Sequence, residues 1–172
     1  MVKGYIQVYT GNGKGKTTAA IGLSIRAAGA GKRVLFIQFV KGEVYSEIKA
    51  LKRYDDLIEI HQYGQGCFIE KQITDEDREL AMTGLNEVKR LLKINNYEVI
   101  VLDEANIALY FGLFTIDELM SVIDCRPKGC EVIITGRYAP KELIELADLV
   151  TEMKEIKHYY TKGVCARKGI EK

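Results

Sequence analysis

The chain has 172 residues, a length that favours one domain, over residues 1–172, with a substantial hydrophobic core. Its 25 basic and 24 acidic side chains nearly balance, so its overall charge gives no reason to expect a nucleic acid or an anionic membrane as a partner. The four cysteines form no C-x-x-C pair, and no apolar run approaches the ~18 residues of a membrane span. We therefore expect a cytoplasmic protein without a zinc site or a disulfide framework.

Apolar, strand-like runs alternate along the chain with amphipathic, helix-like runs, a pattern typical of a parallel α/β sheet. Strands are expected near residues 5–9, 33–40, 57–61, 97–102, 131–135 and 148–152. Helices are expected over residues 16–30, 43–53, 75–94, 115–124 and 140–147. The segments 34–37 and 99–102 are continuously apolar, as strands covered on both faces should be.

The glycine-rich loop after the first expected strand carries the clearest chemical signal. A strand precedes it and a helix follows it, which is the anatomy of a phosphate-binding P-loop. Its glycines let successive backbone N–H groups face an anion, and the helix N-terminus adds a positive dipole end. The residues expected to bind the nucleotide here are Thr10, Gly11, Asn12, Gly13, Lys14, Gly15, Lys16, Thr17 and Thr18.

Two side chains of this loop have specific expected roles. Lys16 brings a full charge to the distal phosphates, and the hydroxyl of Thr17 is placed to ligate Mg²⁺. Thr10 stands where the general G-x-x-x-x-G-K-[ST] pattern has its first glycine, which indicates a subfamily of P-loop proteins. A glycine turn without a ligand is the alternative. The predicted fold is a P-loop NTPase (RecA-like) α/β sandwich of three layers, with about six mostly parallel strands.

A pair of acids, Asp103 and Glu104, ends the buried strand near 97–102. In P-loop proteins such a strand lies beside the P-loop strand, and its acid reaches the Mg²⁺ of the nucleotide. Mg²⁺ (or Mn²⁺) takes few carboxylates besides waters and phosphate oxygens. The predicted metal ligands are therefore Thr17, Asp103 and Glu104, with Glu104 favoured for direct contact. Solvated acids at an ordinary strand end are the alternative.

Arg137 follows the fifth expected strand, so it should face the ligand crevice of an open α/β sheet. There it can neutralise triphosphate charge, or hold a carboxamide or a phosphate of a substrate. A surface arginine without a ligand is the alternative.

Together these residues resemble the ATP:corrinoid adenosyltransferases of the CobA/CobO/BtuR type. The altered P-loop, from Thr10 to Ala20, is the most specific part of the resemblance, which spans nearly the whole chain. The further matching pieces are Gln38 to Gly42, Leu102 to Asn106, Thr135 to Arg137, Ala147 to Met153, and a tail from Lys157 to Ile170.

The resemblance implies that a reduced corrinoid, with cobalt as Co(I), attacks the 5′ carbon of ATP and releases inorganic triphosphate. It implies catalytic roles for Lys16, Arg137 and Phe68, and a nucleotide-binding role for Asn106. Phe68 lies in the segment 62–70 and would help displace the lower axial ligand of cobalt. A core aromatic under a loop is the alternative for Phe68, and relatives also carry a Trp that this chain lacks.

The resemblance also implies partners: a corrinoid substrate, ATP with Mg²⁺, an electron donor such as a reduced flavoprotein, and a second copy in a homodimer. Some relatives cover the nucleotide with an N-terminal segment, and here the C-terminal tail is the candidate replacement. The alternative function is a P-loop kinase or a RecA-like ATPase that transfers or hydrolyses the γ-phosphate. A non-catalytic, ATP-dependent module is a third possibility.

Overall fold

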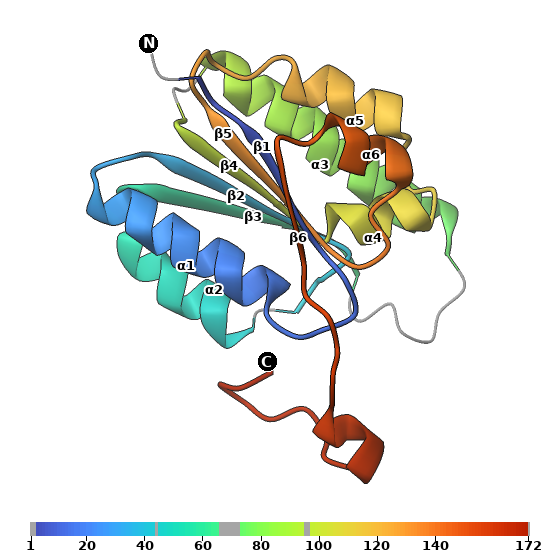
Figure 1. Cartoon of the computed structure of the whole chain (residues 1–172). Coiled ribbons are helices and arrows are strands. Elements are labelled where there is room, and N and C mark those ends of the chain that lie inside the picture. The colour runs from blue at the N-terminus through green and yellow to red at the C-terminus, as the bar shows by residue number, and fades with distance from the viewer. Residues whose placement is uncertain (1–2, 44, 66–72, 95–96, 172) are drawn as a thin grey trace.

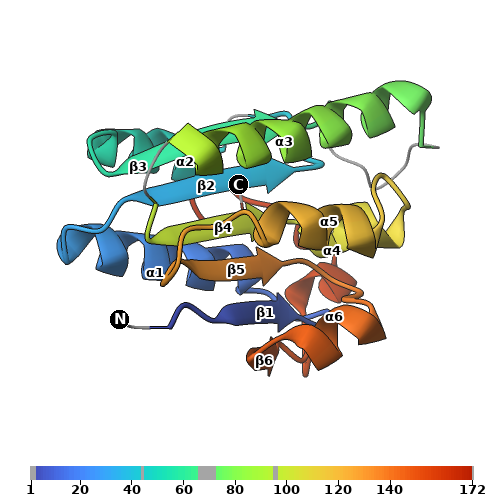
Figure 2. The ribbon, with the colours of Figure 1, turned by 90° about the horizontal axis from the view of Figure 1, so that it is seen from above.

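The computed structural model describes residues 3–43, 45–65, 73–94 and 97–171 as a central sheet with helices on both faces (Figure 1). The sheet has six strands in the order β3-β2-β4-β5-β1-β6, and neighbouring strands pair in parallel (Figure 2). The strands are β1 (Ile6–Thr10), β2 (Val34–Phe39), β3 (Ile58–Tyr63), β4 (Val99–Asp103), β5 (Glu131–Thr135) and β6 (Leu149–Glu152).

The helices form one layer on each face of the sheet (Figures 1 and 2). One layer consists of α1 (Lys16–Gly29), α2 (Ser46–Leu51) and the short 3-10 helix η1 (Lys52–Tyr54). The other layer consists of α3 (Asp75–Ile94), α4 (Ala105–Tyr110), α5 (Ile116–Ile123) and α6 (Lys141–Leu146). The predicted three-layer α/β fold is confirmed. None of the described helices is both long and apolar enough to cross a membrane.

The sheet divides the hydrophobic core into two clusters because alternate side chains of each strand point to opposite faces. In β2, every residue is buried: Leu35 and Ile37 join the cluster under α3, whereas Val34 and Phe36 join the cluster under α1. Complete burial of one such side chain stabilises the fold by about 1.5–3 kcal/mol. The continuous apolar character of this strand follows from its two covered faces.

The helices show the two largest differences from the predicted elements. Helix α4, which follows Glu104 directly, was not anticipated, because its 6 residues are too few to show a helical period. The helix expected over 43–53 begins only at Ser46 and ends in the 3-10 turn η1. Helix α3 has the predicted bounds.

Candidate functional site

Within the part of the chain that the structure describes, three non-glycine residues have positive φ angles, and all of them lie just beyond the carboxyl ends of strands. They are Val40 after β2 (φ 67°), Glu104 after β4 (φ 59°) and Tyr138 after β5 (φ 61°). A β-branched residue rarely adopts such a backbone, and here the N–H of Lys41 donates to the carbonyl of Phe39 at 2.7 Å, closing a tight turn around Val40. Because strained backbone concentrates at functional sites, this edge of the sheet is the first place to look for one.

The P-loop lies at the same edge, between β1 and α1. Gly11 and Gly15 have φ angles of 93° and 121°, which side-chain-bearing residues rarely adopt. A Cβ atom on Gly13 would lie 2.6 Å from the carbonyl oxygen of Met153, and the N–H of Gly13 donates to that oxygen at 2.6 Å. These glycines therefore serve the close approach of the chain after β6 as well as the shape of the loop.

The buried side chain of Lys16 turns into its own loop. Its Nζ donates to the carbonyls of Gly11 and Gly13, each at 2.7 Å. Burial lowers the pKa of Lys16, Glu104 opposes that effect, and the positive charge of Arg137 lowers the pKa further. A buried ammonium beside a second cation creates a positive potential that an anionic ligand would relieve.

Asp103 is fully buried and connects elements that are distant in the sequence. Its Oδ1 accepts hydrogen bonds from the hydroxyls of Thr17 at 2.8 Å and Thr135 at 2.6 Å, and its Oδ2 accepts one from Nε2 of Gln38 at 2.9 Å. The expectation that this acidic strand lies beside the P-loop strand is wrong, because β5 separates β4 from β1. Asp103 still meets Thr17, because α1 crosses under the sheet from β1 toward β4.

Lys41 is a site residue that residue-by-residue reasoning did not single out. Its Nζ lies 3.4 Å from Oδ2 of Asp103 and 3.5 Å from both Oε1 of Glu104 and Oγ1 of Thr17. Burial opposes its charge, but Asp103 and Glu104 together raise the pKa of Lys41. Burial and the charge of Asp103 raise the pKa of Glu104. The sequence did offer a signal for Lys41, because it closely follows a buried strand at the edge of the sheet that holds the P-loop.

Asn106 supports the loop between β5 and α6. Its buried Nδ2 donates to the carbonyl of Gly136 at 3.0 Å, and its Oδ1 is buried without a partner among the described residues. A Cβ atom on Gly136 would lie 2.9 Å from Cβ of Asn106, so the loop packs tightly on α4. This packing leaves Arg137 exposed and within electrostatic range of Lys16.

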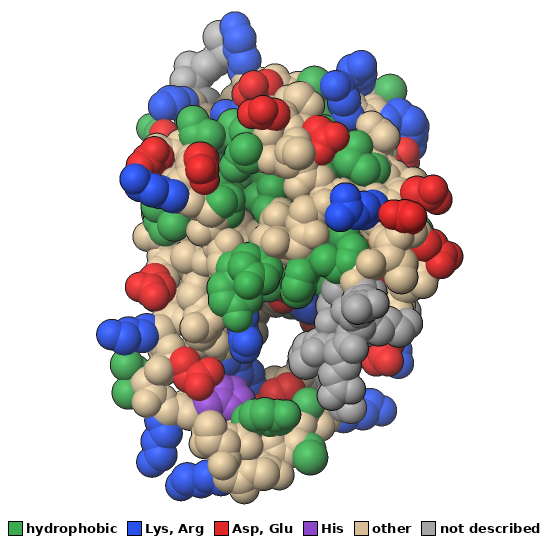
Figure 3. Space-filling view, turned by 90° about the vertical axis from the view of Figure 1, so that its right-hand side faces the viewer, with side chains coloured by type: hydrophobic (Ala, Val, Ile, Leu, Met, Phe, Trp, Pro, Cys, Tyr) green, Lys and Arg blue, Asp and Glu red, His purple; other side chains and the backbone are tan. Residues whose placement is uncertain are grey.

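An aromatic pair beside this loop was also missed by sequence reasoning. The rings of Tyr110 and Tyr138 have centroids 4.4 Å apart at an angle of 34°, and Phe111 lies edge-on to Tyr110 at 5.2 Å. Both tyrosines are about half exposed. Tyr110 belongs to the unanticipated helix α4, which explains the omission. Figure 3 shows hydrophobic side chains on the rim of an opening between the body and the C-terminal segment.

The remaining predicted site residues lie at the rim of the P-loop, within it, or outside the described residues. Lys14 turns away from the centre of the P-loop, and its Nζ donates to the carbonyl of Ile170 at 2.8 Å. Thr10 is buried and its Oγ1 accepts the N–H of Ala139 at 3.3 Å, whereas Asn12 and Thr18 are exposed. Phe68, with the rest of 66–72, lies outside the described residues.

Comparison with solved structures supports the fold. The KaiC-like protein PH0186 from Pyrococcus horikoshii superposes with a TM-score of 0.57 at 14% sequence identity, covering 90% of this chain and 75% of that one. At this identity the likeness concerns the fold alone, and it agrees with the predicted P-loop NTPase architecture.

Comparison with known sequences is more specific. The model of the family described as ATP:corrinoid adenosyltransferase BtuR/CobO/CobP matches residues 2–171. A corrinoid adenosyltransferase from Pseudomonas aeruginosa is 37% identical over 170 residues, covering 98% of this chain and 84% of that protein. The corrinoid adenosyltransferase CobA of Salmonella typhimurium is 36% identical over 170 residues, covering 98% and 86%. The chain therefore belongs to the ATP:corrinoid adenosyltransferase family.

Proposed function

We propose that the carboxyl edge of β1, β2, β4 and β5 is the site at which the adenosyl group of ATP is transferred to the cobalt of a reduced corrinoid. The observation that carries this assignment is the buried ammonium of Lys16, 2.7 Å from two carbonyls inside the P-loop. An anion that enters this loop gains the charge of Lys16, the helix N-terminus of α1 and the nearby charge of Arg137. Family membership supplies the identity of that anion, the triphosphate of ATP.

The transfer makes limited demands on the protein. The electron pair of Co(I) forms the carbon–cobalt bond, the bond from the 5′ carbon to oxygen breaks, and its electrons leave with the triphosphate. Because Co(I) carries no proton, no general base is needed. The residues must instead stabilise the charge that grows on the leaving oxygen, and we assign this role to Lys16 and Arg137. Fixing the 5′ carbon close to cobalt adds a proximity effect.

Mg²⁺ (or Mn²⁺) fits the oxygen groups present at this edge. The carboxylate of Asp103 already accepts three short hydrogen bonds, whereas the carboxylate of Glu104 faces Lys41 at 3.5 Å and is partly exposed. We therefore propose Glu104 and Thr17 as metal ligands, with Asp103 holding the hydroxyl of Thr17 in place. When bound, the ion would neutralise charge on the triphosphate.

The corrin needs a broad apolar wall next to the nucleotide. We propose that the half-exposed pair Tyr110 and Tyr138 supplies part of this wall, because Tyr138 directly follows Arg137 in the loop that approaches Lys16. The role of Phe68 as a wedge below the cobalt stays a prediction. A homodimer and an electron donor such as a reduced flavoprotein are further proposals. Sedimentation of the purified protein would test the first of these.

The deciding experiment is an anaerobic assay with MgATP and chemically reduced cob(I)alamin, following the visible spectrum and identifying the phosphate product. We expect a light-sensitive adenosylcorrinoid with stoichiometric inorganic triphosphate. ADP with phosphate, and no spectral change of the corrinoid, would instead support the alternative of γ-phosphate transfer or hydrolysis.

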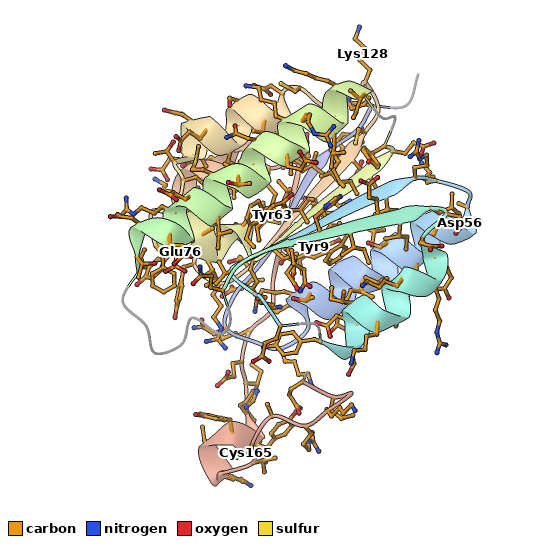
Figure 4. All side chains as sticks on the ribbon, turned by 180° about the vertical axis from the view of Figure 1, so that it is seen from behind. Tyr9, Asp56, Tyr63, Glu76, Lys128 and Cys165 are labelled. Carbon is orange, nitrogen blue, oxygen red and sulfur yellow. The ribbon has the colours of Figure 1, made fainter. Side chains whose placement is uncertain are left out.

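In the same assay, Lys16→Ala is expected to lower kcat about 10²- to 10³-fold, since it removes a cation aimed at the developing charge. Lys128→Ala is the matched control, because Lys128 is exposed at the opposite end of the sheet (Figure 4). Full activity of a well-folded Lys16→Ala protein would contradict the assignment.

A further inference from the structure

The segment that follows β6, residues 153–171, contacts the P-loop both where the segment begins and where it ends. At its start, the carbonyl of Met153 accepts the N–H of Gly13 at 2.6 Å. At its end, Lys14 donates to the carbonyl of Ile170 at 2.8 Å and to Oε1 of Glu171 at 3.0 Å. Between these contacts the segment projects from the body, and Cys165 marks its far side (Figure 4). Most of its residues are exposed.

The carboxylate of Glu171 is held by several hydrogen-bond donors at once. It accepts the backbone N–H of Arg167 at 2.8 Å, Nη2 of Arg167 at 3.1 Å and the hydroxyl of Tyr159, in addition to Lys14. The guanidinium of Arg167 lies 5.0 Å from the ring centre of Tyr159. The side chain of Glu171 is only 16% exposed, against 43% for Lys14. The carboxylate is thus held by several donors of its own segment, and Lys14 is the less buried partner of the pair.

The loop gains from such a contact for a physical reason. Lys14 stands between Gly13 and Gly15, and glycines lose more conformational freedom on ordering than any other residue. A loop that is disordered before ATP binds must lose this entropy on binding, which weakens affinity. A contact that orders the loop in the free protein removes that loss beforehand.

We propose that Glu171 is a positioning residue for the P-loop, which through Lys14 holds the loop in the conformation that receives the triphosphate of ATP. This inference rests on the proposed placement of the triphosphate in the P-loop. It gives the last turn of the chain a role in substrate binding although it lies outside every strand and helix of the sandwich.

An inhibitory role of Glu171 would use the same contacts. If the phosphates needed Lys14 for themselves, Glu171 would compete with ATP, and its removal would tighten binding. The sign of the change in affinity therefore separates a positioning contact from an inhibitory one.

The experiment measures the dissociation constant of MgATP by calorimetry without corrinoid, and KM and kcat by the adenosylation assay. For Glu171→Gln we expect the dissociation constant and the KM for ATP to rise about fivefold, with kcat nearly unchanged, as loss of a partly exposed ion pair within a network implies. Glu155→Gln is the matched control: it removes the same charge from an exposed position of the same segment and should change neither constant.

A double-mutant cycle tests whether Glu171 acts through Lys14. In a Lys14→Met background, Glu171→Gln should cause no further loss of ATP affinity. Tyr159→Phe keeps the ring beneath Arg167 but removes a donor to Glu171, so it should weaken ATP binding in the same direction by about twofold. If Glu171→Gln does not fold, Tyr159→Phe still tests whether the contacts of Glu171 support ATP binding.

Unchanged or tighter ATP binding in Glu171→Gln, or an equal further loss in the Lys14→Met background, would overturn the inference. Failure of the proposed function looks different, since the unmodified protein itself would then bind no MgATP or release no triphosphate.

Discussion

Adjacent residues of one chemical type perform different tasks at this site. Asp103 is fully buried and each of its oxygens accepts hydrogen bonds, so its carboxylate organises the surrounding groups. Glu104 adopts a left-handed backbone, faces Lys41 and keeps part of its side chain exposed. The sequence indicated that one of these acids would contact the metal. The sequence already favoured Glu104 for this contact, and the hydrogen-bond partners of the two acids support the same proposal.

Lys41 supports a residue-scale prediction, because its ammonium lies within 3.5 Å of Glu104 and Thr17, the two groups proposed to bind the metal, and also of Asp103. We expect Lys41→Met to bind Mn²⁺ in the absence of ATP at least about tenfold more tightly than the unmodified protein, since a competing cation is removed. Paramagnetic resonance of free Mn²⁺ measures this affinity.

Lys49→Met, a change at an exposed lysine of α2, is the control for that experiment. Equal Mn²⁺ affinity in the Lys41→Met and unmodified proteins would show that Lys41 does not compete with a divalent cation.

At the scale of elements, capping residues decide where helices begin. Thr74 caps α3, since the N–H of Asp77 donates to its Oγ1 at 3.3 Å and the hydroxyl donates in return to Asp77. Helix α5 begins in the same way, with reciprocal hydrogen bonds between Thr115 and Glu118. Both starts follow from local sequence and are independent of the site.

Thr115→Ala is therefore expected to lower the free energy of unfolding by about 1 kcal/mol without a change in ATP affinity. Urea denaturation measures the first quantity and calorimetry the second. Thr83→Ala, in the interior of α3, is the control, because the hydroxyl of Thr83 donates to a carbonyl of its own helix and caps nothing. A loss of stability as large in the control would argue against capping as the cause.

At the scale of the whole molecule, polar contacts connect four strands of the sheet and the start of α1. Asp103 of β4 accepts from β2, from β5 and from the start of α1, and Gln38 of β2 in turn accepts from Gln62 of β3 at 2.8 Å. Because this second bond fixes the amide of Gln38, its Nε2 must face Asp103. The sheet and the candidate site thus share the same hydrogen bonds.

Asp103→Asn should consequently destabilise the whole fold although it barely changes the shape of the side chain. The new amide places a donor against Nε2 of Gln38 or against the two hydroxyls, leaving a buried group unsatisfied at a cost of about 1–3 kcal/mol. Urea denaturation gives this value, with exposed Asp56→Asn as the control. Equal stability of the two variants would contradict the network.

The sequence by itself determined the succession of strands and of most helices along the chain, the P-loop, and the two acids at the end of β4. These features are encoded locally, in apolar runs, in glycine spacing and in the residues that end each strand. Family membership could likewise be inferred from the sequence, because the motif from Thr10 to Thr18 is contiguous.

Only the tertiary structure decided which residues meet. It placed β5 between β4 and β1, brought Lys41 to the acids, paired Tyr110 with Tyr138, and turned Lys14 toward Glu171. The last pair is separated by 157 positions along the chain. Such contacts depend on how the strands are ordered in space and on how the chain returns after β6, and no local pattern of residues specifies either.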